Sequence, residues 1–310
     1  MALGAPAAFV ALLVLAGSLL ARRLEPVERA AAPSDPETRF LATRSGRVHV
    51  LDLGPTGGAA GGEPILLIHG TGRSIADWQE GLAGRLARSH RVVAFDEYGN
   101  GLSDRPPWGR NGIALWARQA VDVLDALGIP RATVVGHSAG GCVAAILAAD
   151  HPERVARAVF LGHGTAMDPT QIVPILPGVG EVALARMRIF STLFSAEHER
   201  RLAAAYEIRG TRASLLTYLR RQYTIDGIRL VTGTYEAIEA PVLQVHGTLD
   251  ASIPIAAARR LTPRLRQVRF VAVEGIGHDV HVEAPETLAA AIEDFVVATR
   301  PRAPSAFPRP

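Results

Sequence analysis

One stretch near the middle of the chain restricts its fold more than any other. A β-branched apolar run at 133–135 leads into the sequence Gly-His-Ser-Ala-Gly at 136–140, and small and apolar residues follow. The first run predicts a buried strand, and the last predicts a helix that begins at Ala139. A serine in a Gly-x-Ser-x-Gly sequence, with a strand before it and a helix after it, is typical of a sharp turn that exposes a nucleophilic hydroxyl.

The local physics of this turn explains its residues. Ser138 must adopt a strained backbone conformation, so Gly136 and Gly140 leave out side chains that would clash with it. The helix that begins at Ala139 directs free N–H groups and the positive end of its dipole to the same place. The stretch therefore predicts a reactive serine above the edge of a sheet.

Strand and helix patterns alternate along the rest of the chain. Apolar and β-branched runs predict eight strands, at 40–43, 48–53, 64–68, 91–95, 133–135, 158–161, 242–245 and 268–273. Helical spacing predicts helices at 78–87, 113–127, 139–150 and 285–297. This alternation predicts an α/β fold with a mostly parallel eight-stranded sheet flanked by helices.

The strand signals stop between residues 164 and 234. Helical patterns at 183–194, 196–208 and 213–223 predict an inserted helical cap there. We therefore expect a core in two parts, 39–163 and 235–298, on either side of the cap. The Pro-, Ala- and charge-rich residues 22–38 predict a linker, and the Pro-rich residues 299–310 a disordered tail.

The N-terminal residues carry a separate signal. Residues 3–21 contain no charged side chain and are long enough to cross a bilayer. Arg22 and Arg23 follow the run, but no basic residue precedes it, which argues against a standard signal peptide. We predict a membrane anchor at 1–21, with an export signal as the alternative. The positive-inside rule would place the folded domain in the cytoplasm, and an exported protein is the alternative.

Composition excludes several classes of function. All 33 basic residues are arginine, they are scattered, and the net charge is only +3, so we expect no nucleic-acid partner. The single cysteine, Cys142, allows no internal disulfide and no cysteine-based metal site. We expect it to be a buried core residue. No His or carboxylate spacing predicts a metal site, so we expect no metal and no cofactor. The sequence gives no oligomeric state.

Three chemically suitable residues follow predicted strands, in the order Ser138, Asp250 and His278. Sites on open parallel sheets lie beyond the carboxyl ends of the strands, so these side chains are expected to meet. A serine hydroxyl needs a base within hydrogen-bond reach, and that base needs a group that fixes its tautomer. We therefore predict Ser138 as nucleophile, His278 as general base and acid, and Asp250 as the group that orients His278.

Other residues compete for these roles. Five further histidines lie near strand ends or loops: His69, His137, His163, His246 and His281. We expect His69 and His246 to hold loops by hydrogen bonds. His281 is the main alternative base, and Asp279 is a weaker alternative to Asp250.

The oxyanion of a tetrahedral intermediate needs two fixed donors. One is expected to be the backbone N–H of Ala139, directly after the nucleophile. The other is expected from the loop after the strand at 64–68, where Thr71 is the first choice and Gly72 the alternative. The glycines of this loop would let its backbone approach a substrate.

Four motifs together resemble the α/β-hydrolase superfamily over residues 39–298. They are His-Gly-Thr-Gly at 69–72, Asp-x-x-Gly-x-Gly-x-Ser at 96–103, the Gly-x-Ser-x-Gly at 136–140, and Gly-His at 277–278 followed by Glu-Ala-Pro-Glu at 283–286. The resemblance is to the capped branch, which contains epoxide hydrolases, haloalkane dehalogenases, haloperoxidase-like esterases and carbon–carbon bond hydrolases. It implies the α/β-hydrolase fold and a cap that roofs an apolar pocket.

One departure from that branch bears on the chemistry. Epoxide hydrolases and dehalogenases use an aspartate nucleophile, whereas this chain has Ser138. The resemblance therefore implies acyl chemistry, and we expect a serine hydrolase that cleaves an ester of a small to medium apolar molecule. A carbon–carbon bond hydrolase of diketone-like substrates is the first alternative, and a noncatalytic ligand-binding protein on the same fold is the second.

Overall fold

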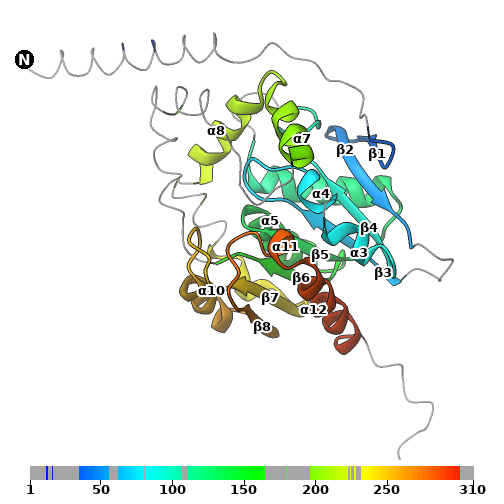
Figure 1. Ribbon diagram of the computed structural model, residues 1–310, viewed down its shortest axis with the longest axis vertical. Helices are drawn as coiled ribbons and strands as arrows, with labels where there is room; N and C mark the ends of the chain where they lie inside the picture. The colour runs from blue at the N-terminus through cyan, green and yellow to red at the C-terminus, as the bar shows by residue number, and fades with distance from the viewer. Residues whose placement is uncertain are drawn as a thin grey trace, which may run out of the picture.

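The computed structural model of the protein describes residues 35–55, 62–79, 81–105, 111–164, 196–222 and 232–300, with single residues at 12, 16, 180, 224 and 227. One eight-stranded sheet runs through these residues, and helices cover both of its faces (Figure 1). The sheet confirms the predicted α/β fold.

All eight predicted strands are present. They are β1 (Thr38–Thr43), β2 (Gly46–Leu53), β3 (Gly62–Ile68), β4 (His90–Phe95), β5 (Ala132–His137), β6 (Val155–Leu161), β7 (Val242–Gly247) and β8 (Val268–Val273). Their order across the sheet is β1-β2-β4-β3-β5-β6-β7-β8. β2 is antiparallel to β1 and β4, and the other pairs are parallel. Only β2 runs in the opposite direction among these eight strands, so the carboxyl ends of the other seven lie at one edge, where the loops of a site can converge.

The core lies on both faces of this sheet. Successive side chains of a strand point to opposite faces. In β3, Leu66 and Ile68 belong to one buried apolar cluster, and Ile65 and Leu67 belong to the other. Because β3 is buried on both faces, its sequence is continuously apolar instead of alternating, as expected for a central parallel strand.

The helices complete the layers. They are α2 (Ala76–Gln79), α3 (Leu82–Leu86), α4 (Ile113–Ala126), α5 (Ala139–Asp150), α7 (Ala196–Tyr206), α8 (Thr211–Gln222), α10 (Ile255–Leu261), α11 (Val280–Glu283) and α12 (Pro285–Ala298), with 3-10 turns η3 (Tyr235–Ala237) and η4 (Thr262–Arg264). Helices α4 and α5 contribute to the cluster of Leu66 and Ile68, and α3 and α12 to the cluster of Ile65 and Leu67.

One helix differs from its prediction. The single helix expected at 78–87 is divided into α2 and α3, with Gly81 in a non-helical conformation directly before α3. A Cβ at Gly81 would lie 3.2 Å from the carbonyl oxygen of His281 and 3.2 Å from Cβ of Pro285. The chain breaks here because a distant segment packs against it, and the local pattern does not carry that information.

Helices α7 and α8 lie between β6 and β7 in the chain, in the segment where the sequence predicts a cap (Figure 1). The ring of Tyr218 on α8 packs on Trp116 of α4, with centroids 4.5 Å apart. The third predicted cap helix, at 183–194, lies outside the described residues, and so does most of 165–195. The domain boundaries at 39, 164, 235 and 298 therefore stay predictions.

The described residues contradict the predicted localisation. Spanning the hydrocarbon core takes about 20 apolar residues in a helix. The longest helices within the described residues, α4 and α12, have 14 residues each, and no helix of that part of the chain is long and apolar enough to cross a membrane. The predicted anchor at 1–21 lies outside the described residues, except for Leu12 and Ala16. The absence of a membrane-spanning helix from the described residues contradicts the prediction of a membrane-anchored enzyme.

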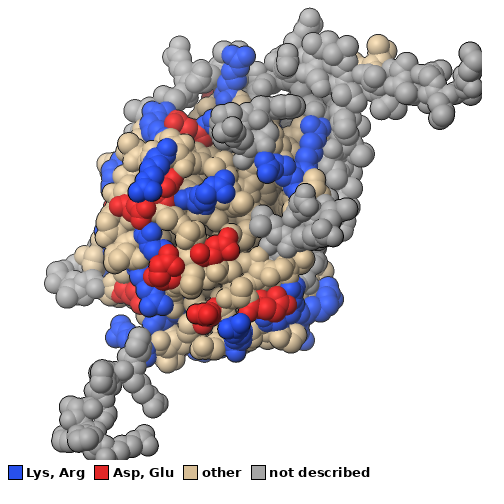
Figure 2. Space-filling view, turned by 180° about the vertical axis from the view of Figure 1, so that it is seen from behind, with Lys and Arg blue, Asp and Glu red and all other residues tan. Residues whose placement is uncertain are grey.

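Charged side chains are mixed on the face opposite to that of Figure 1. Acidic and basic residues alternate across this face without a broad field of either sign (Figure 2). Ion pairs of the described residues include Arg154 with Asp125 and Arg264 with Glu236. This face therefore agrees with the scattered arginines of the sequence.

Candidate active site

Ser138 lies in the sharp turn that the sequence predicts between β5 and α5. Its φ is 51°, and it is the one non-glycine residue with positive φ among the described residues. A Cβ at Gly136 would lie 2.2 Å from the carbonyl oxygen of Gly140, and a Cβ at Gly140 would lie 2.3 Å from that of Ile68. The two glycines therefore permit the strained turn, and such strain is concentrated at functional sites.

A direct hydrogen bond joins Asp250 and His278. Asp250 follows β7 and His278 follows β8, and Nδ1 of His278 lies 2.8 Å from Oδ2 of Asp250. The other carboxyl oxygen of Asp250 accepts hydrogen bonds from the backbone N–H groups of Ser252 and Ile253. The Asp250 side chain is fully buried, whereas 21% of the His278 side chain is exposed. The histidine is thus oriented by one ring nitrogen.

The charge of Asp250 is stabilised by its partners. Nε2 of His246 lies 3.1 Å from Oδ2 of the carboxylate. Burial would raise the pKa of Asp250, but hydrogen bonds from His246, His278 and the Ile253 backbone outweigh burial and hold this pKa well below its ordinary value. Asp250 is therefore a carboxylate throughout the neutral range and can stabilise an imidazolium.

Ser138 and His278 lie at the same edge of the sheet without a hydrogen bond between their side chains in this structure. The Ser138 backbone N–H donates to the carbonyl oxygen of Leu161 at 2.9 Å. Gly162, which follows Leu161 in the chain, packs against the imidazole of His278, because a Cβ at Gly162 would lie 3.1 Å from Nδ1 of His278. The structure thus joins Asp250 to His278 and places Ser138 nearby, and catalytic hydrogen bonds often close only when substrate is bound.

The predicted oxyanion loop runs beside the serine. Residues Gly70 to Arg73 form a turn in which the Arg73 N–H donates to the Gly70 carbonyl oxygen at 3.2 Å, and Gly72 has a φ of 67°. A Cβ at Gly70 would lie 3.3 Å from Cβ of Ser138. Among the hydrogen bonds of the described residues, none uses the backbone N–H of Thr71 or of Ala139.

The cap helices contact this same turn. The hydroxyl of Tyr206, the last residue of α7, donates to the carbonyl oxygen of Gly72 at 2.9 Å. The hydroxyl of Tyr218 on α8 lies 3.4 Å from Oγ1 of Thr71. Helices α7 and α8 therefore hold the backbone and the side chain of the turn from the cap side.

His69 and His246 hold loops, as predicted. Nδ1 of His69 donates to the carbonyl oxygen of Gly70, and its Nε2 accepts from the Glu97 backbone N–H. Burial lowers the pKa of His69, which favours the neutral ring that this pairing needs. Nε2 of His246 donates to the carbonyl oxygen of Ile253 at 2.7 Å.

His163 has a structural contact that the sequence did not assign to it. Its Nδ1 donates to the carbonyl oxygen of Ser138 at 3.0 Å, and its Nε2 accepts from the hydroxyl of Tyr235 at 2.8 Å. Burial lowers the pKa of His163 to about 4, so the ring is neutral at neutral pH. It supports the backbone of the turn.

The two competing residues have other partners. His281 is fully buried, with its ring 4.7 Å from that of Trp78 and Nε2 3.8 Å from Oδ2 of Asp77. Asp279 accepts from Arg73 at 2.8 Å. The geometry therefore favours His278 and Asp250 over both alternatives.

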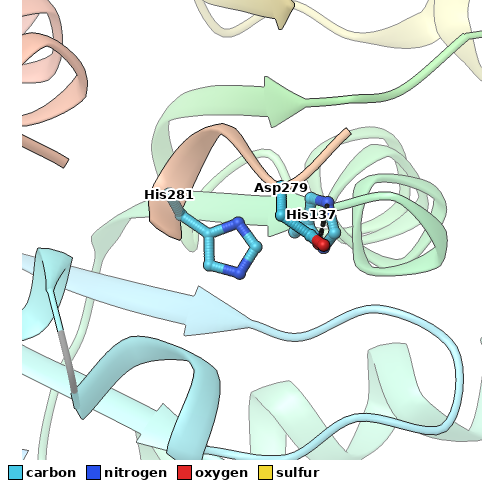
Figure 3. Close-up of side chains that lie close together, drawn as sticks. All are labelled: His137, Asp279 and His281. Atoms are coloured by element: carbon cyan, nitrogen blue, oxygen red, sulfur yellow. Dashed lines mark ion pairs between the residues drawn. The ribbon is translucent and has the colours of Figure 1, made fainter. Parts of the chain in front are cut away.

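His137, Asp279 and His281 form a close group (Figure 3). One ligand-type atom from each lies within 4.8 Å of the others, which makes them the residues to test for a metal. Tetrahedral zinc ligands at about 2.1 Å from the metal would be about 3.4 Å apart. Two of the groups already have partners, because Arg73 donates to Asp279 and Nε2 of His137 donates to the carbonyl oxygen of His278. A metal would have to displace both bonds, so the group fits an ionic and hydrogen-bonded cluster better.

Comparisons with known proteins agree with this fold. The sequence model of the alpha/beta hydrolase fold matches residues 63–186. The chain is 33% identical to the 2-hydroxymuconate semialdehyde hydrolase of Pseudomonas putida over 248 residues, which cover 76% of this chain and 87% of that protein. It is 31% identical to RutD of Caulobacter vibrioides, provisionally named a carbamate hydrolase, over 269 residues, which cover 83% of this chain and 97% of that protein.

A solved structure extends the agreement to the fold. The meta-cleavage product hydrolase CumD of Pseudomonas fluorescens IP01 has a TM-score of 0.67 and 21% identity, and the match covers 86% of this chain and all of that chain. From the motifs, the sheet and these relatives, we conclude that the chain is a hydrolase of the α/β-hydrolase family.

Proposed function

We propose that the protein is a serine hydrolase that cleaves an ester of a small to medium apolar molecule through an acyl-enzyme. The observation that carries the proposal is the positive φ of Ser138 at the edge of the sheet where Asp250 holds His278. A serine in a strained turn and an oriented imidazole at the same sheet edge are the parts from which a nucleophilic hydroxyl is made once the two side chains meet.

In the proposed reaction, Oγ of Ser138 attacks the carbonyl carbon of the ester while Nε2 of His278 takes the hydroxyl proton. The N–H groups of Thr71 and Ala139 donate to the oxyanion of the tetrahedral intermediate. The intermediate collapses, and His278 gives the proton to the departing alkoxide. Water, deprotonated by the same imidazole, then attacks the acyl-serine, and the second tetrahedral intermediate collapses to the carboxylic acid as His278 returns the proton to Oγ of Ser138. Asp250 stays ionised throughout and stabilises the imidazolium.

Carbon–carbon bond hydrolysis of a diketone-like substrate is the second candidate. The favouring observation is the 33% identity to a 2-hydroxymuconate semialdehyde hydrolase over 87% of that protein. The same three residues would serve this reaction, with a carbanion in place of the alkoxide as leaving group. The two candidates therefore differ in substrate and share their residues.

The test compares both substrate classes on the purified full chain. The esters are p-nitrophenyl esters of graded acyl length, and the diketone is a vinylogous one. We expect saturable p-nitrophenol release and labelling by a fluorophosphonate probe. Ser138→Ala should lose both, with kcat lower by about 10³-fold or more. Ser89→Ala is the matched control. Ser89 is exposed, it directly precedes β4 at the opposite edge of the sheet, and its hydroxyl donates a hydrogen bond to the Glu293 carboxylate.

The outcomes separate the candidates. Faster turnover of the diketone than of every ester would replace the ester proposal with the carbon–carbon one. If folded protein turns over neither class and takes up no probe, both fail, and the noncatalytic ligand-binding alternative replaces them.

A further inference from the structure

Arg73 joins the predicted oxyanion turn to two other segments. Its backbone N–H closes the turn on Gly70, two residues after Thr71. One terminal nitrogen of its guanidinium lies 2.8 Å from Oδ1 of Asp279, and Nε lies 3.1 Å from Oδ2 of Asp77 on α2. Only 11% of the Arg73 side chain is exposed. Arg73 therefore closes the turn through its backbone N–H and forms ion pairs with two carboxylates through its side chain.

The carboxylate of Asp279 extends this link to the proposed base. Asp279 follows His278 directly in the chain. Nε2 of His137, the residue before Ser138, donates to the carbonyl oxygen of His278 at 3.1 Å and lies 3.7 Å from Oδ1 of Asp279 (Figure 3). The turn, the His278 loop and the nucleophile turn are thus tied together by one buried cluster.

We propose that Arg73 is a positioning residue that sets the oxyanion turn and the His278 loop in register with Ser138. This inference rests on the proposed function. Arg73 touches no reacting atom in it, and it acts through the turn of Thr71 and through Asp279.

An arginine suits this place for two reasons. Its planar guanidinium offers several donors in a fixed fork, so different nitrogens reach Asp77 and Asp279, whereas the single ammonium of a lysine holds such a pair less firmly. Its charge also compensates two carboxylates that are buried, and removing one partner of a buried ion pair is strongly destabilising. Removal could therefore lower stability and activity together, and the test must separate these effects.

The test uses two arginine variants and a matched control. Arg73→Lys keeps the charge, and Arg73→Met removes it. Arg154→Met is the control. Only 15% of the Arg154 side chain is exposed, and its guanidinium lies 2.8 Å from the carboxylate of Asp125. Arg154 directly precedes β6, so it lies at the opposite edge of the sheet from Ser138. For each protein, kcat and KM are measured on the best p-nitrophenyl ester, and the melting temperature is measured in parallel.

A second pair of variants removes the contact between Arg73 and Asp279 from the Asp279 side. Asp279→Ala removes the acceptor for Arg73, and Asp279→Asn keeps an oxygen acceptor without the charge. Both leave the contact of Arg73 with Asp77 in place, so they test the His278 loop even if Arg73→Met does not fold.

We expect a change in kcat at nearly constant KM. A small displacement of catalytic groups lowers the chemical step, so kcat should fall about 100-fold in Arg73→Met and about tenfold in Arg73→Lys, with KM within about threefold of wild type. Asp279→Asn should recover most of the kcat that Asp279→Ala loses. Arg154→Met should keep the wild-type kcat whatever its melting temperature.

Two results would overturn the inference. One is a wild-type kcat in folded Arg73→Lys and Asp279→Ala. The other is a loss in Arg73→Met that Arg154→Met reproduces at an equal loss of melting temperature. A wild-type protein that turns over no ester and takes up no fluorophosphonate would instead refute the proposed function.

Discussion

At the scale of single residues, the backbone of Ser138 carries a cost that its side chain does not explain. A positive φ is unfavourable for any residue with a Cβ and costs about 1–3 kcal/mol at such a site. The surrounding turn keeps this conformation because Gly136 and Gly140 remove the clashes that would oppose it. Stability has therefore been given up at the position where a hydroxyl must be exposed.

This cost can be measured by comparing two inactive variants. Ser138→Gly relieves the strain and Ser138→Ala keeps it, while both lack the hydroxyl. After allowing for the greater freedom of glycine in the unfolded chain, we expect the free energy of unfolding of Ser138→Gly to exceed that of Ser138→Ala by about 1 kcal/mol. Urea unfolding of both variants measures the difference. A more stable Ser138→Ala would show that the turn is not strained.

At the scale of elements, the start of α5 and the loop after β3 fit together without room for a side chain. A Cβ at Gly140 would lie 2.3 Å from the carbonyl oxygen of Ile68 and 2.6 Å from that of His69. Both atoms belong to the backbone, so they cannot turn away as a flexible side chain can. The close approach brings the turn of Thr71 beside Ser138.

Gly140→Ala should therefore lower both stability and activity. We expect a loss of about 1–3 kcal/mol in the free energy of unfolding, as for other overpacked sites, together with loss of ester hydrolysis because the oxyanion turn is displaced. Gly84→Ala in α3 is the control, since a Cβ there meets nothing within 4 Å, and it should stabilise by about 0.5–1 kcal/mol. Equal effects of the two substitutions in urea unfolding would contradict the packing argument.

Elements that depend on local pattern could be predicted from the sequence, and those that depend on distant partners could not. The buried strands are continuous apolar runs, and the three predicted site residues follow strands in a fixed order, so both were readable. The division between α2 and α3 was not, because it depends on contact with His281 and Pro285. The pairing of Arg73 with Asp279 was not either, since 206 positions separate them.

At the scale of the whole molecule, buried ionisable groups give stability two opposing slopes with pH. Burial lowers the pKa of His69, His137 and His163, the last to about 4. Unfolding lets these rings take up protons, so their contribution is complete above about pH 6.5 and is lost as the pH falls. Acid should therefore destabilise the protein well before its carboxylates are protonated.

Glu97 acts in the opposite direction. Its side chain is fully buried, and neither carboxyl oxygen has a hydrogen-bond partner among the described residues. Burial, and then the charge of Asp96, raise the pKa of Glu97 well above its ordinary value. Glu97 therefore does not oppose folding below the pKa of an unfolded glutamate. As the pH rises from there toward the pKa of Glu97 in the folded protein, the free energy of unfolding falls, because the unfolded glutamate ionises and the folded one does not.

Glu97→Gln should remove this second slope. Between about pH 5 and pH 8 the variant should gain melting temperature relative to wild type, and the gain should grow with pH because an unfolded glutamate ionises from about pH 4.3 upward. Thermal unfolding across this range measures it. A difference that does not change with pH would mean that Glu97 is not held neutral in the folded protein.

The bond from Tyr206 to Gly72 has a consequence for substrate entry. This hydrogen bond joins α7 to the oxyanion turn. Its acceptor is the carbonyl oxygen of Gly72, the residue after Thr71. In the proposed reaction, Thr71 of this turn donates to the oxyanion, so an outward movement of α7 must either break the bond or displace that donor. Movement of α7 to admit a substrate and the placement of the oxyanion turn are therefore coupled, because a shift of the helix away from the site loosens the turn of Thr71.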